Sequence, residues 1–172
     1  MSPATVDLPA ATPVAAPLLV FSWGNPSRGD DALGPLFAEH LQALQARHPE
    51  WPGIEILTDF QLQVEHALDL RGRDRVLFVD ASTALTEPCR LERIDARRDA
   101  SFTTHAMSPQ AVLQVYADLE DDAPPPAWLL SIRGHDFELG TGLSTAAREA
   151  LAAALALAAQ WIDALPTGDA PA

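Results

Sequence analysis

The chain has 172 residues, of which 48% are hydrophobic, and this length suits one domain with a hydrophobic core. Its 24 acidic side chains outnumber 11 basic ones, for a net charge of -13, and no basic cluster is present to neutralise phosphates. We therefore expect neither nucleic-acid binding nor attachment to an anionic membrane. The single cysteine, Cys89, cannot form an internal disulfide, which suits the reducing cytoplasm.

The two ends of the chain are expected to lie outside the folded domain. Residues 1–17 are rich in Ala and Pro and lack the positively charged start of a secretory signal, so they predict a disordered tail. Residues 166–172 form a second predicted tail. No apolar run approaches the roughly 18 residues of a membrane span. The sequence therefore predicts a single domain over residues 18–165.

A strand-to-helix turn opens this domain. Apolar residues predict a strand over 18–23 and then a helix that starts near residue 31 and runs to about residue 48. The turn between them carries Asp30 and Asp31. Because Pro35 fits only the first turn of a helix, both carboxylates are expected at its N-terminus. Either could simply cap the helix there, and Asp30 is the expected cap.

A second strand and a short helix come next. Alternating residues 54–57 predict the strand, which ends at Asp59. Apolar residues at helical spacing predict a short helix within residues 61–70. His66 lies on that helix and is expected to be exposed to solvent.

Residues 75–80 make the clearest strand in the sequence. This near-continuous apolar run is typical of a strand whose two faces are both covered by helices. Asp80 is expected to be its last residue. At the carboxyl end of a central parallel strand, Asp80 would lie at the same edge of the sheet as Asp30 and Asp31. Ligand sites of open α/β sheets form along this edge.

The remaining elements complete an α/β fold with a mostly parallel sheet of about five strands. The strand at 89–94 follows a connection too short for a parallel crossover, so it is expected to run antiparallel. His105 precedes a helix capped by Ser108; taken alone, a loop histidine is more often a surface residue. The other expected elements are this helix at 109–119, a strand at 128–133, and a final helix from its cap Ser144 to about 165.

Several kinds of chemistry have little support in the sequence. No serine occupies a G-x-S-x-G elbow, and Cys89 lies at the wrong end of a strand for a nucleophile. The opening turn matches neither G-x-G-x-x-G nor a P-loop, which disfavours nucleotide binding. What remains is Asp30 or Asp31 with Asp80 and His105. Two oxygens and one nitrogen suit a first-row divalent metal that polarises a carbonyl or generates hydroxide.

Three motifs carry a family resemblance. They are Gly24-Asn25-Pro26-Ser27-Arg28-Gly29-Asp30-Asp31-Ala32-Leu33-Gly34, Val79-Asp80-Ala81 and Thr104-His105. In this order, over about residues 18–165, the chain resembles the nickel-iron hydrogenase maturation endopeptidases. Residues 59–63 and 134–140 are most similar to the branch that matures cytosolic NAD-reducing hydrogenases.

The resemblance implies an α/β/α sandwich and a cytoplasmic protease. Such a protease removes a short C-terminal extension from the hydrogenase large-subunit precursor once nickel is inserted. In this chain Asp31, Asp80 and His105 would ligate that nickel, which would place the scissile peptide. The substrate would supply the nickel, so no built-in cofactor is expected, although other divalent ions could occupy the site.

The resemblance also implies that four further residues bind the substrate: Asn25, Asp59, Gln61 and Glu138. The chain departs from the family pattern at two places. Many members have Glu where this chain has Asp31, and the Gly-Gly-Thr that commonly follows the second strand is absent here.

Two alternative functions remain. A non-catalytic chaperone or nickel checkpoint would bind the same large subunit without cutting it. A metal-independent aspartic-type hydrolase would use Asp31 and Asp80 as a pair that shares one proton, and it would tolerate His105→Ala.

Overall fold

The computed structural model describes residues 15–99 and 106–166. His105, the predicted tail residues 1–14 and residues 167–172 lie outside these ranges. Within the described ranges, no helix is both long and apolar enough to cross a membrane. The elements, in chain order, are strand β1 (Leu18–Trp23), 3₁₀ helix η1 (Gly29–Ala32), helix α1 (Leu33–Gln45), strand β2 (Ile54–Asp59), 3₁₀ helix η2 (Val64–Leu70), strand β3 (Arg75–Ser82), strand β4 (Cys89–Ile94), helix α2 (Pro109–Glu120), strand β5 (Ala127–Arg133) and helix α3 (Thr145–Asp163).

The strands form one sheet in the order β2-β1-β3-β5-β4. All neighbouring pairs are parallel except β4 and β5, which are antiparallel. This confirms both the mostly parallel sheet and the antiparallel fourth strand. The six-residue connection between β3 and β4 is too short for the crossover that a parallel neighbour needs.

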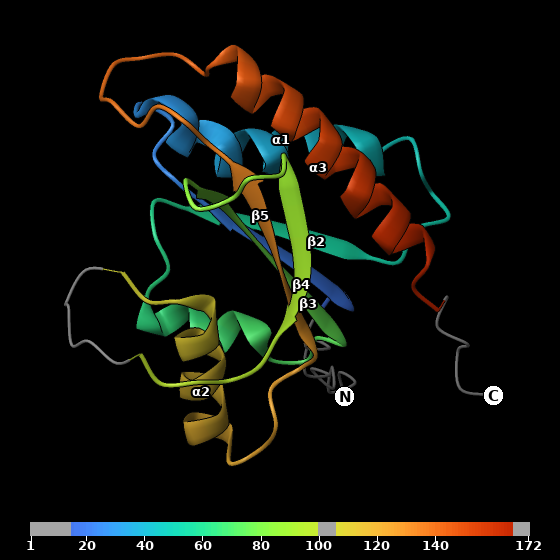
Figure 1. The fold of residues 1–172 in the computed structure, drawn as a ribbon. Helices are drawn as coiled ribbons and strands as arrows, with labels where there is room; N and C mark the ends of the chain where they lie inside the picture. Colours follow the sequence, from blue (N-terminus) through green and yellow to red (C-terminus); the bar gives the residue numbers. More distant parts are fainter. Residues whose placement is uncertain (1–14, 100–105, 167–172) are drawn as a thin grey trace, which may run out of the picture.

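Helices cover both faces of the sheet, so the fold has three layers (Figure 1). Helices α1 and α3 pack on one face, while α2 and η2 pack on the other. The packing of the central strand β3 on both faces of the sheet explains why its sequence is continuously apolar. Val76 and Phe78 pack toward α2 and η2, and Leu77 and Val79 pack toward α1 and α3.

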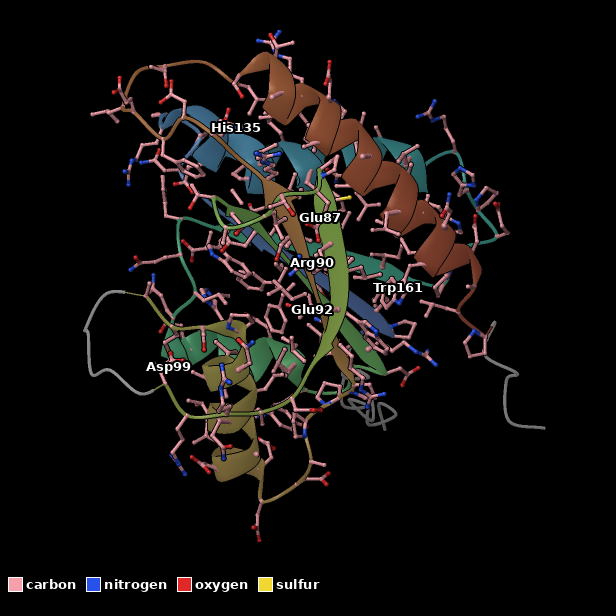
Figure 2. The ribbon with its side chains drawn as sticks, viewed as in Figure 1. Glu87, Arg90, Glu92, Asp99, His135 and Trp161 are labelled. Atoms are coloured by element: carbon pink, nitrogen blue, oxygen red, sulfur yellow. The ribbon has the colours of Figure 1, made fainter. Side chains whose placement is uncertain are left out.

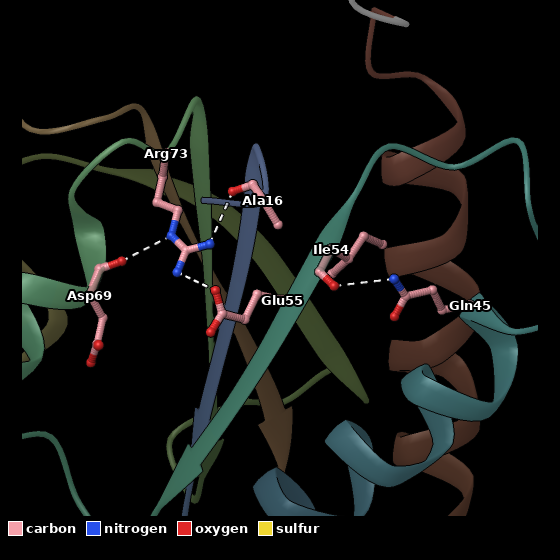
Figure 3. Close-up of polar contacts among 6 residues, drawn as sticks. All are labelled: Ala16, Gln45, Ile54, Glu55, Asp69 and Arg73. Carbon is pink, nitrogen blue, oxygen red and sulfur yellow. Dashed lines mark hydrogen bonds and ion pairs between the residues drawn. The ribbon is translucent and has the colours of Figure 1, made fainter. Parts of the chain in front are cut away.

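Polar contacts tie the amino ends of the strands to neighbouring loops (Figure 3). The side chain of Arg73, only 6% exposed, donates to the carbonyl oxygens of Asp69 and Ala16 and pairs with Glu55 of β2. At the end of α1, Gln45 Nε2 donates to a backbone oxygen at the start of β2 over 3.1 Å. The Arg73 bonds connect the loop before β3 with β2 and with the residues that precede β1, and the Gln45 bond connects α1 with β2.

Three elements differ from their predicted bounds. Helix α1 ends at Gln45 rather than near residue 48, because residues 46–48 form a tighter turn before Pro49. Strand β3 continues to Ser82, so Asp80 is not its last residue; it pairs with Ser131 of β5, which extends the ladder.

The short helix at 61–70 is also different. It is a 3₁₀ helix that begins at Val64, with a reciprocal cap between Gln63 and His66. The prediction that His66 is exposed is wrong, since only 8% of it is accessible. Its ring packs against Phe21 of β1, with 4.5 Å between ring centroids.

Candidate functional site

The carboxyl ends of four parallel strands form one continuous edge. Backbone hydrogen bonds join these ends beyond the sheet itself. Gly24, just after β1, donates to the oxygen of Asp59 at the end of β2 over 3.1 Å. Gly134, just after β5, donates to the oxygen of Ser82 at the end of β3 over 3.0 Å. The loops that leave this edge therefore have fixed starting points.

The turn between β1 and α1 folds back on itself. Gly24 has φ +150°, and a Cβ there would lie 2.0 Å from the backbone oxygen of Asp31, so only glycine fits. The backbone N–H of Asn25 donates to Asp31 Oδ2 over 2.9 Å. The side-chain oxygen of Asn25 accepts from the N–H of Ser27 over 2.9 Å. Asn25, predicted to bind substrate, thus shapes the turn that holds Asp31.

Asp30 has a different role from the predicted one. It is fully buried, and its carboxylate accepts the backbone N–H groups of His135, Asp136 and Ser144 over 2.7, 3.0 and 2.8 Å. The Ser144 hydroxyl adds a fourth bond of 2.8 Å. Burial alone would raise the pKa of Asp30, but these hydrogen bonds outweigh it and lower the pKa. The expectation that Asp30 caps α1 is wrong, because α1 has no side-chain cap.

Backbone bonds reinforce this link between the opening turn and the loop from residue 134 to 144, which we call the β5–α3 loop. Asp30 N donates to the oxygen of Asp136 over 2.6 Å, and Gly29 N donates to the oxygen of Thr141 over 3.2 Å. His135, at the start of this loop, lies where β5 leaves the sheet (Figure 2). Glu138, predicted to bind substrate, is exposed on the same loop.

Asp31 and Asp80 come together at this edge. Burial raises the pKa of Asp80 to about 7; the N–H of Ala81 opposes this change, and the negative charge of Asp31 adds to it. Asp80 is therefore partly protonated near neutral pH while metal-free. The partnership of these two carboxylates follows from the fold, since η1 and the end of β3 adjoin at the carboxyl edge.

The third predicted ligand, His105, lies outside the described residues. Among the residues that are described, no three His, Cys, Asp or Glu side chains gather closely enough to hold a metal ion. The structure thus brings together two of the predicted ligands. It leaves the complete set of three as a prediction.

The end of β2 adds a further carboxylate. Asp59 closes the strand, and its side chain is 35% exposed. Its Oδ1 accepts the N–H of Phe60 over 2.6 Å, and its Oδ2 lies 3.2 Å from Nε2 of His66. Gln61 is half-buried beside it. Sequence reasoning missed His66; the three-residue spacing from Gln63, which allows a reciprocal cap, is the signal that could have found it.

Two surface hollows are found among the described residues. One, about 340 Å³, is lined by residues 92–97 and Gln110, beside the start of β5. The other, about 430 Å³, is lined by residues of α1, α3 and the loop before α3. Neither includes Asp31 or Asp80.

The chemistry available at the edge follows from the two carboxylates. Carboxylate oxygens are ligands for divalent cations, and a close pair of carboxyl groups can also share one proton.

None of the protein-family models matches this sequence. No curated protein matches it either. Solved structures do share its fold. The [NiFe] hydrogenase maturation protease HycI from Thermococcus kodakarensis is 22% identical with a TM-score of 0.66, over 86% of this chain and 93% of that chain.

Two further structures are similar over comparable lengths. The hydrogenase maturating endopeptidase HybD from E. coli is 21% identical with a TM-score of 0.63, over 85% of this chain and 91% of that chain. The maturation protease HybD from T. kodakarensis is 19% identical with a TM-score of 0.58, over 84% and 98%. At these identities the likeness establishes the α/β fold.

Proposed function

We propose that this protein is an endopeptidase that removes the C-terminal extension of a nickel-iron hydrogenase large-subunit precursor after nickel insertion. The observation that carries the proposal is the meeting of Asp31 and Asp80 at the carboxyl edge of the sheet. The names of the solved structures with the same fold, hydrogenase maturation proteases, support this choice of substrate.

The site residues would act on nickel that the precursor carries. Asp31 and Asp80 would each offer an oxygen to that nickel, and His105 would offer a ring nitrogen. Asp80 must lose its proton to ligate, so nickel displaces a proton that the metal-free protein holds near neutral pH. Nickel held by these residues would place the scissile peptide against the edge, and it would supply polarisation of the peptide carbonyl or activation of water.

The proposal fixes the partner and the compartment. The precursor of the large subunit is the substrate, and the nickel arrives with it rather than residing in the protease. Hydrogenases that reduce NAD in the cytoplasm are the proposed partners, on the basis of the sequence resemblance of residues 59–63 and 134–140 to the branch of proteases that serves them.

Mass spectrometry of the precursor tests the proposal. Wild-type protein incubated with nickel-loaded precursor is expected to shorten it by one C-terminal fragment, while Asp31→Asn and Asp80→Asn leave it intact. Glu87→Gln is the matched control, since among the residues that the structure describes this acidic side chain pairs with its neighbours Thr86 and Arg90 and lies away from Asp31 and Asp80 in the sequence. A precursor that binds tightly and keeps its full mass would instead identify a non-catalytic chaperone or nickel checkpoint.

One observation favours a second candidate, an aspartic-type hydrolase that needs no metal. Burial is the main cause of the raised pKa of Asp80, and the charge of Asp31 adds to it, so the two carboxyl groups lie near enough to interact, as a pair that shares one proton requires. This enzyme would keep its activity in His105→Ala and would cut a metal-free precursor. The nickel-dependent protease would lose activity under both conditions.

A further inference from the structure

His66 links the buried side of the sheet to a carboxylate at the site. Its ring packs against Phe21 of β1, tilted by 55° to the Phe21 ring, and is almost wholly buried. Its Nε2 points to Oδ2 of Asp59, a side chain that is 35% exposed at the end of β2. A ring fixed in the core therefore holds a carboxylate that substrate can reach.

The hydrogen bonds define which ring nitrogen carries the proton. The backbone N–H of Gln63 donates to Nδ1 of His66 over 2.9 Å, so Nδ1 contributes its lone pair. The ring proton is therefore on Nε2, which donates to Asp59 over 3.2 Å. Because the N–H of Phe60 holds the other carboxylate oxygen over 2.6 Å, Asp59 is fixed through both of its oxygens.

The sheet register places Asp59 level with Asp80. Trp23 of β1 aligns with Asp59 of β2, and Ser22 aligns with Val79 of β3, so Asp80 is level with Trp23 on the other side. Residues in register on parallel strands point to the same face. Two strand spacings of about 4.8 Å separate the Cα atoms of Asp59 and Asp80 by roughly 10 Å, a distance that a few residues of extended peptide span.

We propose that His66 is a positioning residue of the protease site, which orients Asp59 toward hydrogen-bond donors of the substrate peptide that lies along the carboxyl edge. This inference rests on the proposed function. The two ring nitrogens have different partners. Nδ1 accepts the backbone N–H of Gln63 at the start of η2, and Nε2 donates to Asp59. Only the second contact bears on the substrate.

Two substitutions separate these contacts. His66→Asn keeps an oxygen near the position of Nδ1 that can accept from Gln63, but it is too short to reach Asp59. His66→Gln extends an amide to the position of Nε2 and restores the bond to Asp59. Both lose the ring that packs against Phe21, so their free energies of unfolding, measured in urea, are expected to fall by similar amounts.

The cleavage rate of nickel-loaded precursor then decides the role of His66. We expect His66→Asn to lower kcat/KM at least tenfold and His66→Gln to retain at least a third of the wild-type value. We also expect His66→Asn combined with Asp59→Asn to be no slower than the slower single variant, because both changes remove one interaction. Equal rates for the two His66 variants, or losses that multiply in the double variant, would overturn the inference.

Two outcomes distinguish the inference from the function on which it rests. A wild-type protein that leaves the precursor uncut refutes the proposed function, whatever the variants do. The imidazole ¹⁵N–¹H correlations of the metal-free wild type test the geometry without any substrate. A proton on Nε2 of His66 supports the inference, and a proton on Nδ1 overturns it.

Discussion

Asp30 and Asp31 are adjacent in the chain, and their carboxylates have different surroundings. Asp30 is buried and accepts four hydrogen bonds from the β5–α3 loop and the start of α3. Asp31 is half-buried and, among the described residues, accepts one bond, from Asn25, while its charge acts on Asp80. The first carboxylate therefore stabilises the opening turn, and the second is left as a member of the candidate site.

Replacing each of these two residues by Asn should affect different properties: the change at Asp30 should mainly lower stability, and the change at Asp31 should mainly remove activity. Asp30→Asn removes a charge that accepts four hydrogen bonds, so it should lower the free energy of unfolding by roughly 3 kcal/mol. Asp31→Asn should change it by less than about 1 kcal/mol and should abolish cleavage. Urea unfolding and the precursor assay measure both quantities. Equal destabilisation by the two changes would contradict the division of roles.

Asp80 makes the stability of the metal-free protein depend on pH. Its pKa rises from 3.8 to about 7 on folding, so the folded state binds the extra proton between these values. Stability should therefore fall as pH rises through this window, because the folded state must then release that proton or bury a charge. Asp80→Asn removes this dependence.

The difference in the free energy of unfolding between Asp80→Asn and wild type should change between pH 5 and pH 8. Relative to wild type, the free energy of unfolding of the variant should rise by roughly 2.7 kcal/mol over this range, since about two pH units lie below the pKa of about 7 and each corresponds to about 1.4 kcal/mol. Urea unfolding with a chelator present measures the difference. An equal difference in the free energy of unfolding at both pH values would show that folding does not raise the pKa of Asp80.

At the scale of elements, the opening turn and the β5–α3 loop act as one unit. Gly29 has φ +51°, and a Cβ there would lie 2.3 Å from the oxygen of Asp136, so the two segments touch through backbone. Ser144 joins the unit to α3, because its hydroxyl accepts from Ala147 and donates to Asp30. Glu138 is thereby held on a loop tied to the same turn as Asp31.

The two serine caps offer a matched test of this unit. Ser108 caps α2 and bonds to Asp99, and Ser144 caps α3 and bonds to Asp30. Asp99 is exposed, near the start of α2 (Figure 2), whereas Asp30 is buried. Ser108→Ala should cost about 1 kcal/mol, the usual value of a cap.

Ser144→Ala should cost roughly 2–3 kcal/mol, because it also leaves a buried carboxylate short of a donor. It should slow cleavage as well, since the loop that carries Glu138 loosens. Thermal or urea unfolding of the two variants gives the comparison. A larger loss for Ser108→Ala would contradict the account of Asp30 as the anchor of this unit.

At the scale of the molecule, the sequence predicts the sheet well because its signals are local. The apolar run of β3, the Ser-Pro start of α2 and the short connection before β4 each determine one element. They are enough to predict a mostly parallel sheet with one antiparallel strand, and the structure confirms it.

The errors arise where a residue's partner lies far along the chain. Asp30 looks like a cap until the β5–α3 loop, more than a hundred residues later, supplies its donors. His66 looks exposed because its covering residue, Phe21, belongs to β1. Asp80 looks like a strand end because Ser131, which extends the ladder, belongs to β5. The placement of Asp31 and Asp80 at one edge of the sheet follows from the topology, since η1 contacts β3 there.

The rate of cleavage with and without nickel tests the central claim most directly. Purified wild-type protein is incubated with nickel-loaded or metal-free large-subunit precursor, and the shortened product is followed over time by mass spectrometry. We predict that the nickel-loaded precursor is trimmed at least a hundred times faster. Equal rates for the two precursors would contradict the recognition of nickel by Asp31, Asp80 and His105.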